Sequence, residues 1–433
     1  MAELSEQVAR REVRGWYVVA ICMLAYVFSF VDRQILALMI GPIEADLGIS
    51  DTQFGLLHGF AFAIFYATMG IPLAGLSDRV SRPGVIAAGI AVWSAATVIC
   101  GFARSFAQLF VARVFVGAGE AALSPATYSL ISDLFPKEKL GRAVAVYSMG
   151  SFFGTGLAFL AGGAVSALVG ASGEVSFLGS QMKAWQAVFI IVGAPGFLLA
   201  LIMALTVRDP GRSGTASAPP LADVLRLIAR DRAIYAPHII GYTLAAAALF
   251  AVLGWSPAVL IRGFGMTPAQ AGGWLGALAL TAGVGGVVSS GWIMDALTRA
   301  GYAASPFLTG VIGSAGTLVF AAVLPFAGGL SGTLWVLGGL LFFASFPMPP
   351  STAVMQIAAP PAMRSRVSAL FLCSNSLIGA TLGALLVGLF NDRLFGAAGS
   401  GVAQSLGLVA GAAGLLSAII LCFGCKPFSC LRP

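Results

Sequence analysis

Charged residues are scarce in this chain. Only 9% of its 433 residues are Asp, Glu, Lys or Arg, and 58% are hydrophobic. A soluble domain carries about 25% charged residues. Together with a mean hydropathy of +0.94, this composition excludes a soluble globular protein and predicts an integral membrane protein.

Groups that carry catalysis are also scarce. The chain has two histidines, His58 and His238, and lacks a G-x-S-x-G nucleophile elbow, an H-E-x-x-H zinc motif and a phosphate-binding Gly-Lys loop. These absences argue against an enzyme and against direct coupling to ATP. Of the six cysteines, Cys422 and Cys425 have the spacing of half a metal site, but no second ligand pair is near them in the sequence. We therefore expect no metal and no cofactor.

Long apolar runs fill most of the chain. Twelve runs have about 20 mostly apolar residues, the length that crosses a bilayer. They centre near residues 28, 65, 93, 120, 155, 197, 248, 281, 315, 345, 377 and 412. Backbone groups cannot go unpaired in lipid, so these runs must be helices. The predicted fold class is all-α integral membrane with twelve transmembrane helices.

The basic residues are distributed unevenly between the connecting segments. With the N-terminus in the cytoplasm, the predicted cytoplasmic segments carry eighteen of the 24 Lys and Arg residues, and the opposite side carries four. This bias predicts that both termini are cytoplasmic. The net charge of +7 therefore reflects topology and not a nucleic acid partner. We expect a multi-pass protein of a bacterial inner membrane, an assignment that rests on the short loops.

The two halves of the chain repeat at an offset of 217 residues. Ser50 with Gln53, and Thr267 with Gln270, are both capping-box patterns that open a span. Two pseudo-symmetric six-helix bundles of this kind are typical of transporters, whose site lies between the bundles. The matching positions are Gly48, Gln53, Gly55, Gly59, Asp78 and Arg82 with Gly265, Gln270, Gly272, Gly276, Asp295 and Arg299.

A stretch rich in Gly, Ser and Pro separates the two bundles and predicts a flexible linker. An amphipathic helix follows it, which we expect to lie on the cytoplasmic membrane surface with Leu221, Val224, Leu225 and Ile228 on one face. The predicted segments are a cytoplasmic N-terminal segment (1–14), an N-terminal bundle (15–207), a cytoplasmic linker (208–235), a C-terminal bundle (236–425) and a cytoplasmic tail (426–433).

Several short motifs resemble those of a known family. AGLSDRVSR (74–82) and GWIMDALTR (291–299) are similar to the two cytoplasmic loop motifs of the major facilitator superfamily, and RVFVGAG (113–119) resembles its fourth-helix Arg motif. FVDR (30–33), GAGEAALSPA (117–126) and ISDLFP (131–136) are similar to the Spinster-type branch. The resemblance implies a secondary transporter that works by alternating access.

Four charged residues lie inside the predicted spans, all in the N-terminal half: Asp32, Arg33, Arg113 and Glu120. A charge at the centre of a bilayer costs about 3 kcal/mol, so such residues are functional candidates. A rise of ~1.5 Å per residue places Asp32 and Arg113 about 12 and 10 Å from the periplasmic face, and Glu120 about 21 Å from it. The shared level predicts that Arg113 pairs with Asp32.

Two interpretations of these four residues remain open. They form a static ion-pair network that joins the first and fourth helices, or one acid changes its protonation during transport. In the second interpretation Glu120 is the main proton-coupling residue and Asp32 assists it, because desolvation favours a neutral carboxyl. Arg33, Arg113 and Glu120 would then bind the substrate.

The family resemblance also implies a gate at the cytoplasmic helix ends. Its residues would be Asp78, Arg79 and Arg82 in the first half and Asp295 and Arg299 in the second. The second copy departs from the usual pattern, since Ala replaces a usual Arg at position 296, which predicts a weaker gate there. Alternatively, the arginines serve only as a topology signal.

Taken together, the sequence predicts a proton-coupled secondary transporter that acts as a monomer. The Spinster resemblance implies an amphiphilic substrate of the sphingoid phosphate or lysophospholipid class. Its acyl tail could contact aromatic residues of the second half, which could equally face lipid or core. These are Phe250, Trp255, Trp274, Phe342, Phe343 and Phe371. The rival is a transporter of small organic anions that uses Arg33 and Arg113 for a carboxylate.

Overall fold

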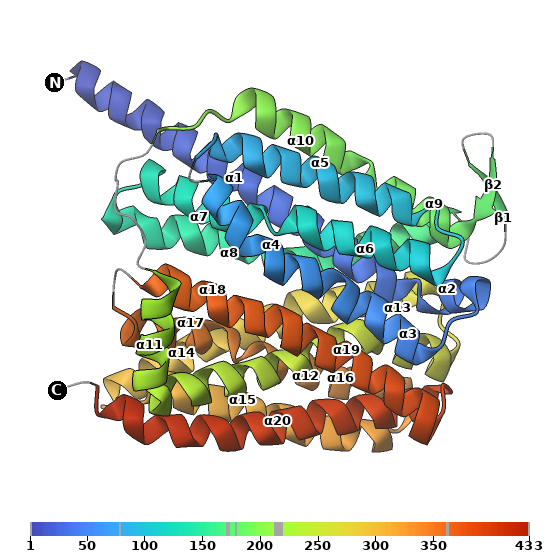
Figure 1. Cartoon of the computed structure of the whole chain (residues 1–433). Coiled ribbons are helices and arrows are strands. Elements are labelled where there is room, and N and C mark those ends of the chain that lie inside the picture. The colour runs from blue at the N-terminus through green and yellow to red at the C-terminus, as the bar shows by residue number, and fades with distance from the viewer. Residues whose placement is uncertain are drawn as a thin grey trace.

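The computed structural model describes residues 2–77, 79–169, 174–177, 180–211, 220–360 and 363–431. Among them, twelve helical segments are long and apolar enough to cross a membrane, which confirms the predicted spans. The two six-helix halves lie side by side, the N-terminal half above the C-terminal half in Figure 1. We call the end of the bundle that holds both chain termini the termini end, and the end that holds the β-hairpin the hairpin end.

The N-terminal half contains spans one to six. Its elements are α1 (Ala2–Leu38), α2 (Ile40–Leu47), α3 (Asp51–Gly55), η1 (Leu56–Ala61), α4 (Phe62–Ser77), α5 (Arg82–Cys100), α6 (Phe106–Glu120), α7 (Leu123–Leu134), α8 (Lys137–Val169), β1 (Glu174–Phe177), β2 (Ser180–Lys183), α9 (Ala184–Gly193) and α10 (Pro195–Thr206). The two strands pair antiparallel, with Glu174 opposite Lys183. The segment η1 is a π-helical turn that joins α3 to α4 in the second span.

The C-terminal half contains spans seven to twelve and is preceded by α11 (Leu221–Arg230). Its elements are α12 (Arg232–Phe264), α13 (Pro268–Leu278), η2 (Ala279–Gly283), α14 (Val284–Arg299), α15 (Ser305–Val323), η3 (Leu324–Phe326), α16 (Gly329–Ser345), α17 (Met348–Ala358), α18 (Arg364–Ser374), η4 (Asn375–Ala380), α19 (Thr381–Phe390), η5 (Asn391–Phe395) and α20 (Gly399–Ser429). The segments η2, η4 and η5 are π-helical.

The predicted repeat has the same local structure in both halves. Gly48 ends α2 with φ 63°, and Ser50 and Gln53 then form a capping box at the start of α3. In the second half, Gly265 ends α12 with φ 64°, and the capping box of Thr267 and Gln270 opens α13. Glycine adopts this left-handed conformation without steric penalty. Both predicted capping boxes are confirmed.

The two halves meet closely where the second span crosses the eleventh. There α3 and η1 pack against α19. A Cβ atom on Gly55 would lie 2.6 Å from the Ala384 carbonyl oxygen, and one on Gly59 would lie 2.7 Å from that of Ala380. Only glycine permits so close an approach of two membrane helices. The halves are therefore in backbone contact toward the hairpin end.

The amphipathic helix of the linker forms as α11, but the face it buries differs from the prediction. Val224 and Leu227 are buried against the C-terminal half and Ile228 packs partly buried beside them, whereas Leu221 and Leu225 are exposed. The helix runs across the termini end of that half (Figure 1). The stripe of Val224, Leu227 and Ile228 is narrow because the helix packs on protein along it.

Candidate functional site

The centre of the N-terminal half contains an ion pair between Arg33 on α1 and Glu120 on α6. Arg33 Nη2 lies 2.5 Å from Glu120 Oε2, and Arg33 Nε donates to the same oxygen at 2.7 Å. The side chain of Glu120 is 1% exposed and that of Arg33 is 14% exposed. Arg33 is therefore the member of the pair that a ligand can reach.

Three aromatic rings surround the Arg33 guanidinium. Its Cζ atom lies 4.3 Å from the centre of the Phe62 ring, 4.9 Å from that of Phe30 and 5.0 Å from that of Tyr66. Cation–π contacts at these distances stabilise a guanidinium in an apolar setting. Phe30 precedes Arg33 by one helical turn, whereas Phe62 and Tyr66 come from α4. This aromatic cage places Arg33 between the first, second and fourth spans.

Arg113 contacts Asp32 in a way that the sequence did not predict. Its Nη1 donates to the backbone carbonyl oxygen of Asp32 at 2.9 Å, and within the described residues no ion pair joins it to the Asp32 carboxylate. Both side chains are buried. Among the described residues, Asp32 Oδ1 and the Nε and Nη2 atoms of Arg113 have no hydrogen-bond partner. The site therefore keeps unused hydrogen-bonding capacity beside the Arg33–Glu120 pair.

The direction of helical side chains explains this pattern. Side chains on a helix lean toward its N-terminus. The helix α1 starts at the termini end, so Arg33 leans away from the hairpin end and toward Glu120. The helix α6 runs the opposite way, so Arg113 leans toward the hairpin end, the direction in which the backbone carbonyl oxygens of α1, including that of Asp32, point. Depths counted from Cα positions alone omit this lean, and Arg33 consequently reaches an acid estimated to lie deeper.

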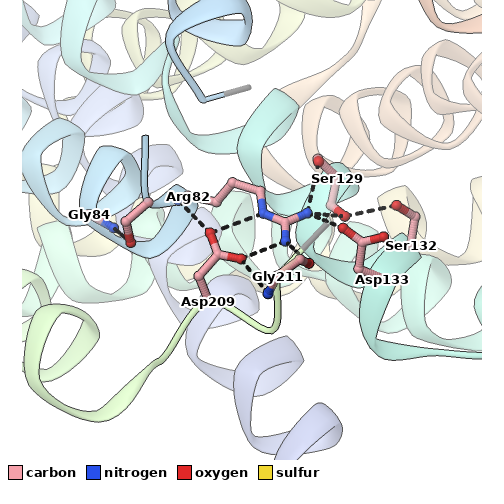
Figure 2. Close-up of polar contacts among 8 residues, drawn as sticks. Arg82, Gly84, Ser129, Ser132, Asp133, Asp209 and Gly211 are labelled. Carbon is pink, nitrogen blue, oxygen red and sulfur yellow. Dashed lines mark hydrogen bonds and ion pairs between the residues drawn. The ribbon is translucent and has the colours of Figure 1, made fainter. Parts of the chain in front are cut away.

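A second polar cluster surrounds Arg82 at the termini end (Figure 2). Arg82 is fully buried and forms ion pairs with Asp133 on α7 and with Asp209, which follows α10. Its Nη2 lies 2.6 Å from Asp209 Oδ1, and the same atom donates to the Gly211 carbonyl oxygen at 2.8 Å. Hydrogen bonds from Arg82 lower the pKa of the Asp209 carboxyl to about 2. We call this group the Arg82 node.

The predicted gate residues do not all behave alike. Asp78 lies outside the described residues. Arg79, Asp295 and Arg299 are exposed, and no ion pair of the described residues includes them. The Arg82 node lies wholly in the N-terminal half, where it joins α5, α7 and the chain after α10. The hydrogen bonds and ion pairs that Arg82 makes to described residues therefore join α5, α7 and the chain after α10 to one another.

Sequence reasoning missed the Asp209 and Gly211 members of the node. Asp209 precedes Pro210 and Gly211, a combination typical of a turn. The sequence prediction therefore assigns these residues to the cytoplasmic linker. The second half contains no equivalent node at the repeat offset, because Pro350 and Lys426 occupy the positions that correspond to Asp133 and Asp209.

Sequence reasoning also missed an ion-pair cluster that joins the two halves at the hairpin end. Arg262 at the end of α12 contacts Glu44 on α2 at 2.5 Å and Asp51 on α3 at 2.8 Å. Asn391 Nδ2 donates to Asp51 Oδ2 at 2.6 Å. Asp392 accepts from the backbone N–H of Thr52 at 2.9 Å and from its hydroxyl at 2.6 Å. These residues form the hairpin-end latch.

The latch contains more negative than positive charge around Glu44. Burial and the neighbouring Asp51 raise the pKa of Glu44, the Arg262 guanidinium opposes them, and the resulting pKa is about 8. Glu44 Oε1 has no hydrogen-bond partner. The sequence places Arg262 among the four basic residues on the predicted periplasmic side. Nothing local in the sequence indicated its partners, because they lie more than 200 positions away.

Two of the aromatic residues proposed to contact an acyl tail are core residues. Trp255 is buried and donates from its Nε1 to the Ala384 carbonyl oxygen at 2.9 Å. Phe371 is buried against His238, with ring centres 4.7 Å apart. Trp274 is 49% exposed.

Within the described residues, no group of three or more His, Cys, Asp or Glu side chains has the arrangement of a metal site.

Comparison with known proteins gives a consistent result. A family model described as Major Facilitator Superfamily matches residues 22–384. The MFS-type efflux pump of Mycolicibacterium smegmatis is 29% identical over 403 residues, which cover 91% of this chain and 88% of the pump. The D-galactonate transporter of Escherichia coli is 28% identical over 312 residues, or 67% of this chain and 69% of that protein.

The structure is similar to that of a bacterial homologue of the human lysosomal transporter Spinster in an inward-facing, unoccupied conformation. The TM-score is 0.79 at 25% sequence identity, and the alignment covers 96% of this chain and 97% of the other. The helical fold, the sequence motifs and the two-half architecture therefore all indicate the same protein family.

Proposed function

The chain belongs to the Major Facilitator Superfamily, and from that premise we propose that it is a proton-coupled secondary transporter of an amphiphilic anion. The observation that carries this proposal is the Arg33–Glu120 pair. Arg33 is the more accessible cation of the site, and its partner Glu120 is almost fully enclosed. One interaction therefore links anion binding to the protonation state of a carboxyl group.

The coupling follows from competition for Arg33. A substrate phosphate or carboxylate that binds the Arg33 guanidinium takes the place of Glu120. A buried carboxylate that loses its cation takes up a proton more readily. Substrate binding and proton binding to Glu120 thus favour one another, and by linkage the reverse also holds. Asp32 lies on the adjacent position of α1 with a free carboxyl oxygen, where it would assist the transfer.

Alternating access would proceed by opening the hairpin end while the termini end closes. The hairpin-end latch and the contact of Gly55 and Gly59 with α19 hold the halves together on one side. We propose that the hairpin end faces the periplasm and both termini the cytoplasm, as the distribution of basic residues predicts. The protein would then act in the inner membrane as a monomer.

The proposed substrate is a sphingoid phosphate or a lysophospholipid. The relation to Spinster supports a lipid-like molecule, and the aromatic cage around Arg33 supports an anionic headgroup, because a guanidinium binds phosphate bidentately. The alternative is a small organic anion. Similarity to the D-galactonate transporter favours it, and so does Arg113, which keeps two donors without partners.

Gradient-driven uptake into proteoliposomes tests the proposal. Purified protein is reconstituted with an imposed pH gradient, and uptake of a radiolabelled lysophosphatidate is measured against competing short-chain acids and long-chain amphiphiles. Competition by the amphiphiles alone supports the lipid-like substrate, and competition by short acids alone supports the alternative. Uptake that ignores the pH gradient would refute proton coupling.

A further inference from the structure

Asn375 is a polar residue at the start of η4 that the proposed mechanism does not yet use. Its carboxamide oxygen is buried, and within the described residues no hydrogen bond reaches it. Buried polar groups are nearly always hydrogen-bonded, so an orphan of this kind requires an explanation. The question is what its side chain faces.

The π-helical turn determines the direction of Asn375. Residues five apart point about 140° from one another on an α-helix, whereas in a π-helix the hydrogen bond joins such residues and brings them onto one face. The structure shows this alignment directly. Ser374 Oγ lies 3.1 Å from Thr243 Oγ1 on α12, and Gly379 also packs on Thr243. Asn375 and Ala380, one position further on, therefore share the next face.

That next face is directed at the N-terminal half. The Ala380 carbonyl oxygen lies against Gly59 in η1. Both α18 and η4 pack against α4. Asn375 thus lies on the surface that the C-terminal half presents to the second span.

The antiparallel register gives its level in the membrane. Gly55 meets Ala384 and Gly59 meets Ala380, so a step of four residues along one helix matches a step of four back along the other. Continued toward the termini end, this register places Asn375 near residue 64. That position lies between Phe62 and Tyr66, the two rings of α4 that contact Arg33.

We propose that Asn375 is the C-terminal half's hydrogen-bonding contact for substrate, opposite Arg33. The inference rests on the proposed function, since it assumes an anion at Arg33. A carboxamide accepts from hydroxyl or ammonium groups and donates to oxygen. The ligand class is therefore an anion that carries a hydroxyl or ammonium group beside its phosphate or carboxylate. One molecule would then bridge the two halves through Arg33 and Asn375.

Binding of matched ligand pairs to the full chain in nanodiscs tests this assignment. The first pair is 1-oleoyl-lysophosphatidate and oleyl phosphate, which differ in the glycerol with its free hydroxyl. The second pair is gluconate and hexanoate. We expect wild type to prefer the hydroxylated member of the bound pair about tenfold, the size of one net hydrogen bond. Asn375→Ala should reduce this preference to about one and leave oleyl phosphate or hexanoate binding within twofold.

The control variant is Ser374→Ala. Ser374 is adjacent to Asn375 but faces α12, so this variant loses a hydrogen bond there and should keep the tenfold preference. Asn375→Leu, of similar volume, serves if the alanine variant unfolds. A preference that survives both Asn375 variants, or that Ser374→Ala also abolishes, overturns the assignment while Arg33-dependent binding upholds the proposed function. If wild type binds neither pair, the proposed function fails and this inference fails with it.

Discussion

The hairpin-end latch should make the closed arrangement depend on pH, and Glu44 is the residue responsible. In the latch its pKa is about 8, against an ordinary value of 4.5. Opening would leave Asp51 beside Glu44 in the same half but expose Glu44 to water, which removes the burial that is the main cause of the raised pKa and returns the pKa toward the ordinary value. The closed latch therefore binds the proton more tightly, and acidification stabilises it. This stabilisation is lost as the pH rises through about 8.

The size of the effect follows from proton linkage. Between pH 8 and pH 6, the closed form with a pKa of about 8 gains its proton, whereas the open form does not. The difference amounts to about 2.3 kcal/mol in favour of closure, or roughly fiftyfold in the equilibrium between closed and open latch. A group at this end exchanges protons with one side of the membrane only. Glu44 would thus sense pH without carrying the transported proton.

Electron–electron double resonance between spin labels at positions 45 and 400 measures the opening. Both positions are exposed, and they lie on opposite halves at the hairpin end. In a cysteine-depleted background, the fraction of the longer distance should fall on going from pH 8 to pH 6. Glu44→Gln mimics the protonated acid, so it should remain closed at both values.

The matched control for this measurement is Asp46→Asn. Asp46 belongs to the same short helix α2, but it accepts a hydrogen bond from Trp185 at 3.0 Å and lies outside the latch. Its variant should keep the wild-type response. The reasoning is refuted if wild type shows no change between pH 8 and pH 6, or if Glu44→Gln responds as wild type does.

Four other perturbations test the remaining parts of the structure. Glu120→Gln should abolish uptake driven by a pH gradient while substrate exchange in proteoliposomes remains measurable; full gradient-driven uptake would transfer the coupling role to Asp32. Arg33→Ala should weaken anion binding by about tenfold or more, the contribution of a charge-assisted hydrogen bond, and adding Asp32→Ala should restore thermal stability but not uptake. Arg82→Ala should lower the free energy of unfolding by about 2 kcal/mol, because two partly buried acids lose the charged donor of their hydrogen bonds, and guanidinium denaturation of the full chain would show no change if the node is dispensable. Gly59→Val should shift the spin-label distances toward the open hairpin end at every pH, since its side chain cannot fit against Ala380; unchanged distances would contradict the close packing.

The fold was predictable because the bilayer imposes strong rules on sequence. Twelve apolar runs must be helices, and the paired capping boxes at Ser50 and Thr267 reveal the repeat through local chemistry alone. The four intramembrane charges were predictable for the same reason, since lipid tolerates charge only where protein or water receives it. Predictions succeeded wherever a rule acts on residues close in sequence.

The pairing of those charges was not predictable from depth. An arginine side chain extends far from its Cα atom, and its lean along the helix decided that Arg33 reaches Glu120 and that Arg113 reaches the Asp32 carbonyl oxygen. The latch was not predictable either, because Arg262 meets acids that lie 211 and 218 positions away. Such contacts depend on how the two halves are placed, and that placement is set by glycine packing distributed over several helices.

The two halves divide the tasks of transport in an unequal way. The N-terminal half contains the ionisable centre and the Arg82 node, and the node fastens helices of this half to one another by ion pairs that do not have to break when the halves move. The C-terminal half contributes Arg262, Asn391 and Asp392 at one end and neutral polar groups at the middle. Within the described residues, its hydrogen bonds and ion pairs to the first half are those of the hairpin-end latch, which includes the buried Asp51 and Asn391. In the mechanism that we propose, movement of the halves therefore has to break the hairpin-end latch but not the Arg82 node. The proposed substrate, bound between Arg33 and Asn375, would then be the link across the centre.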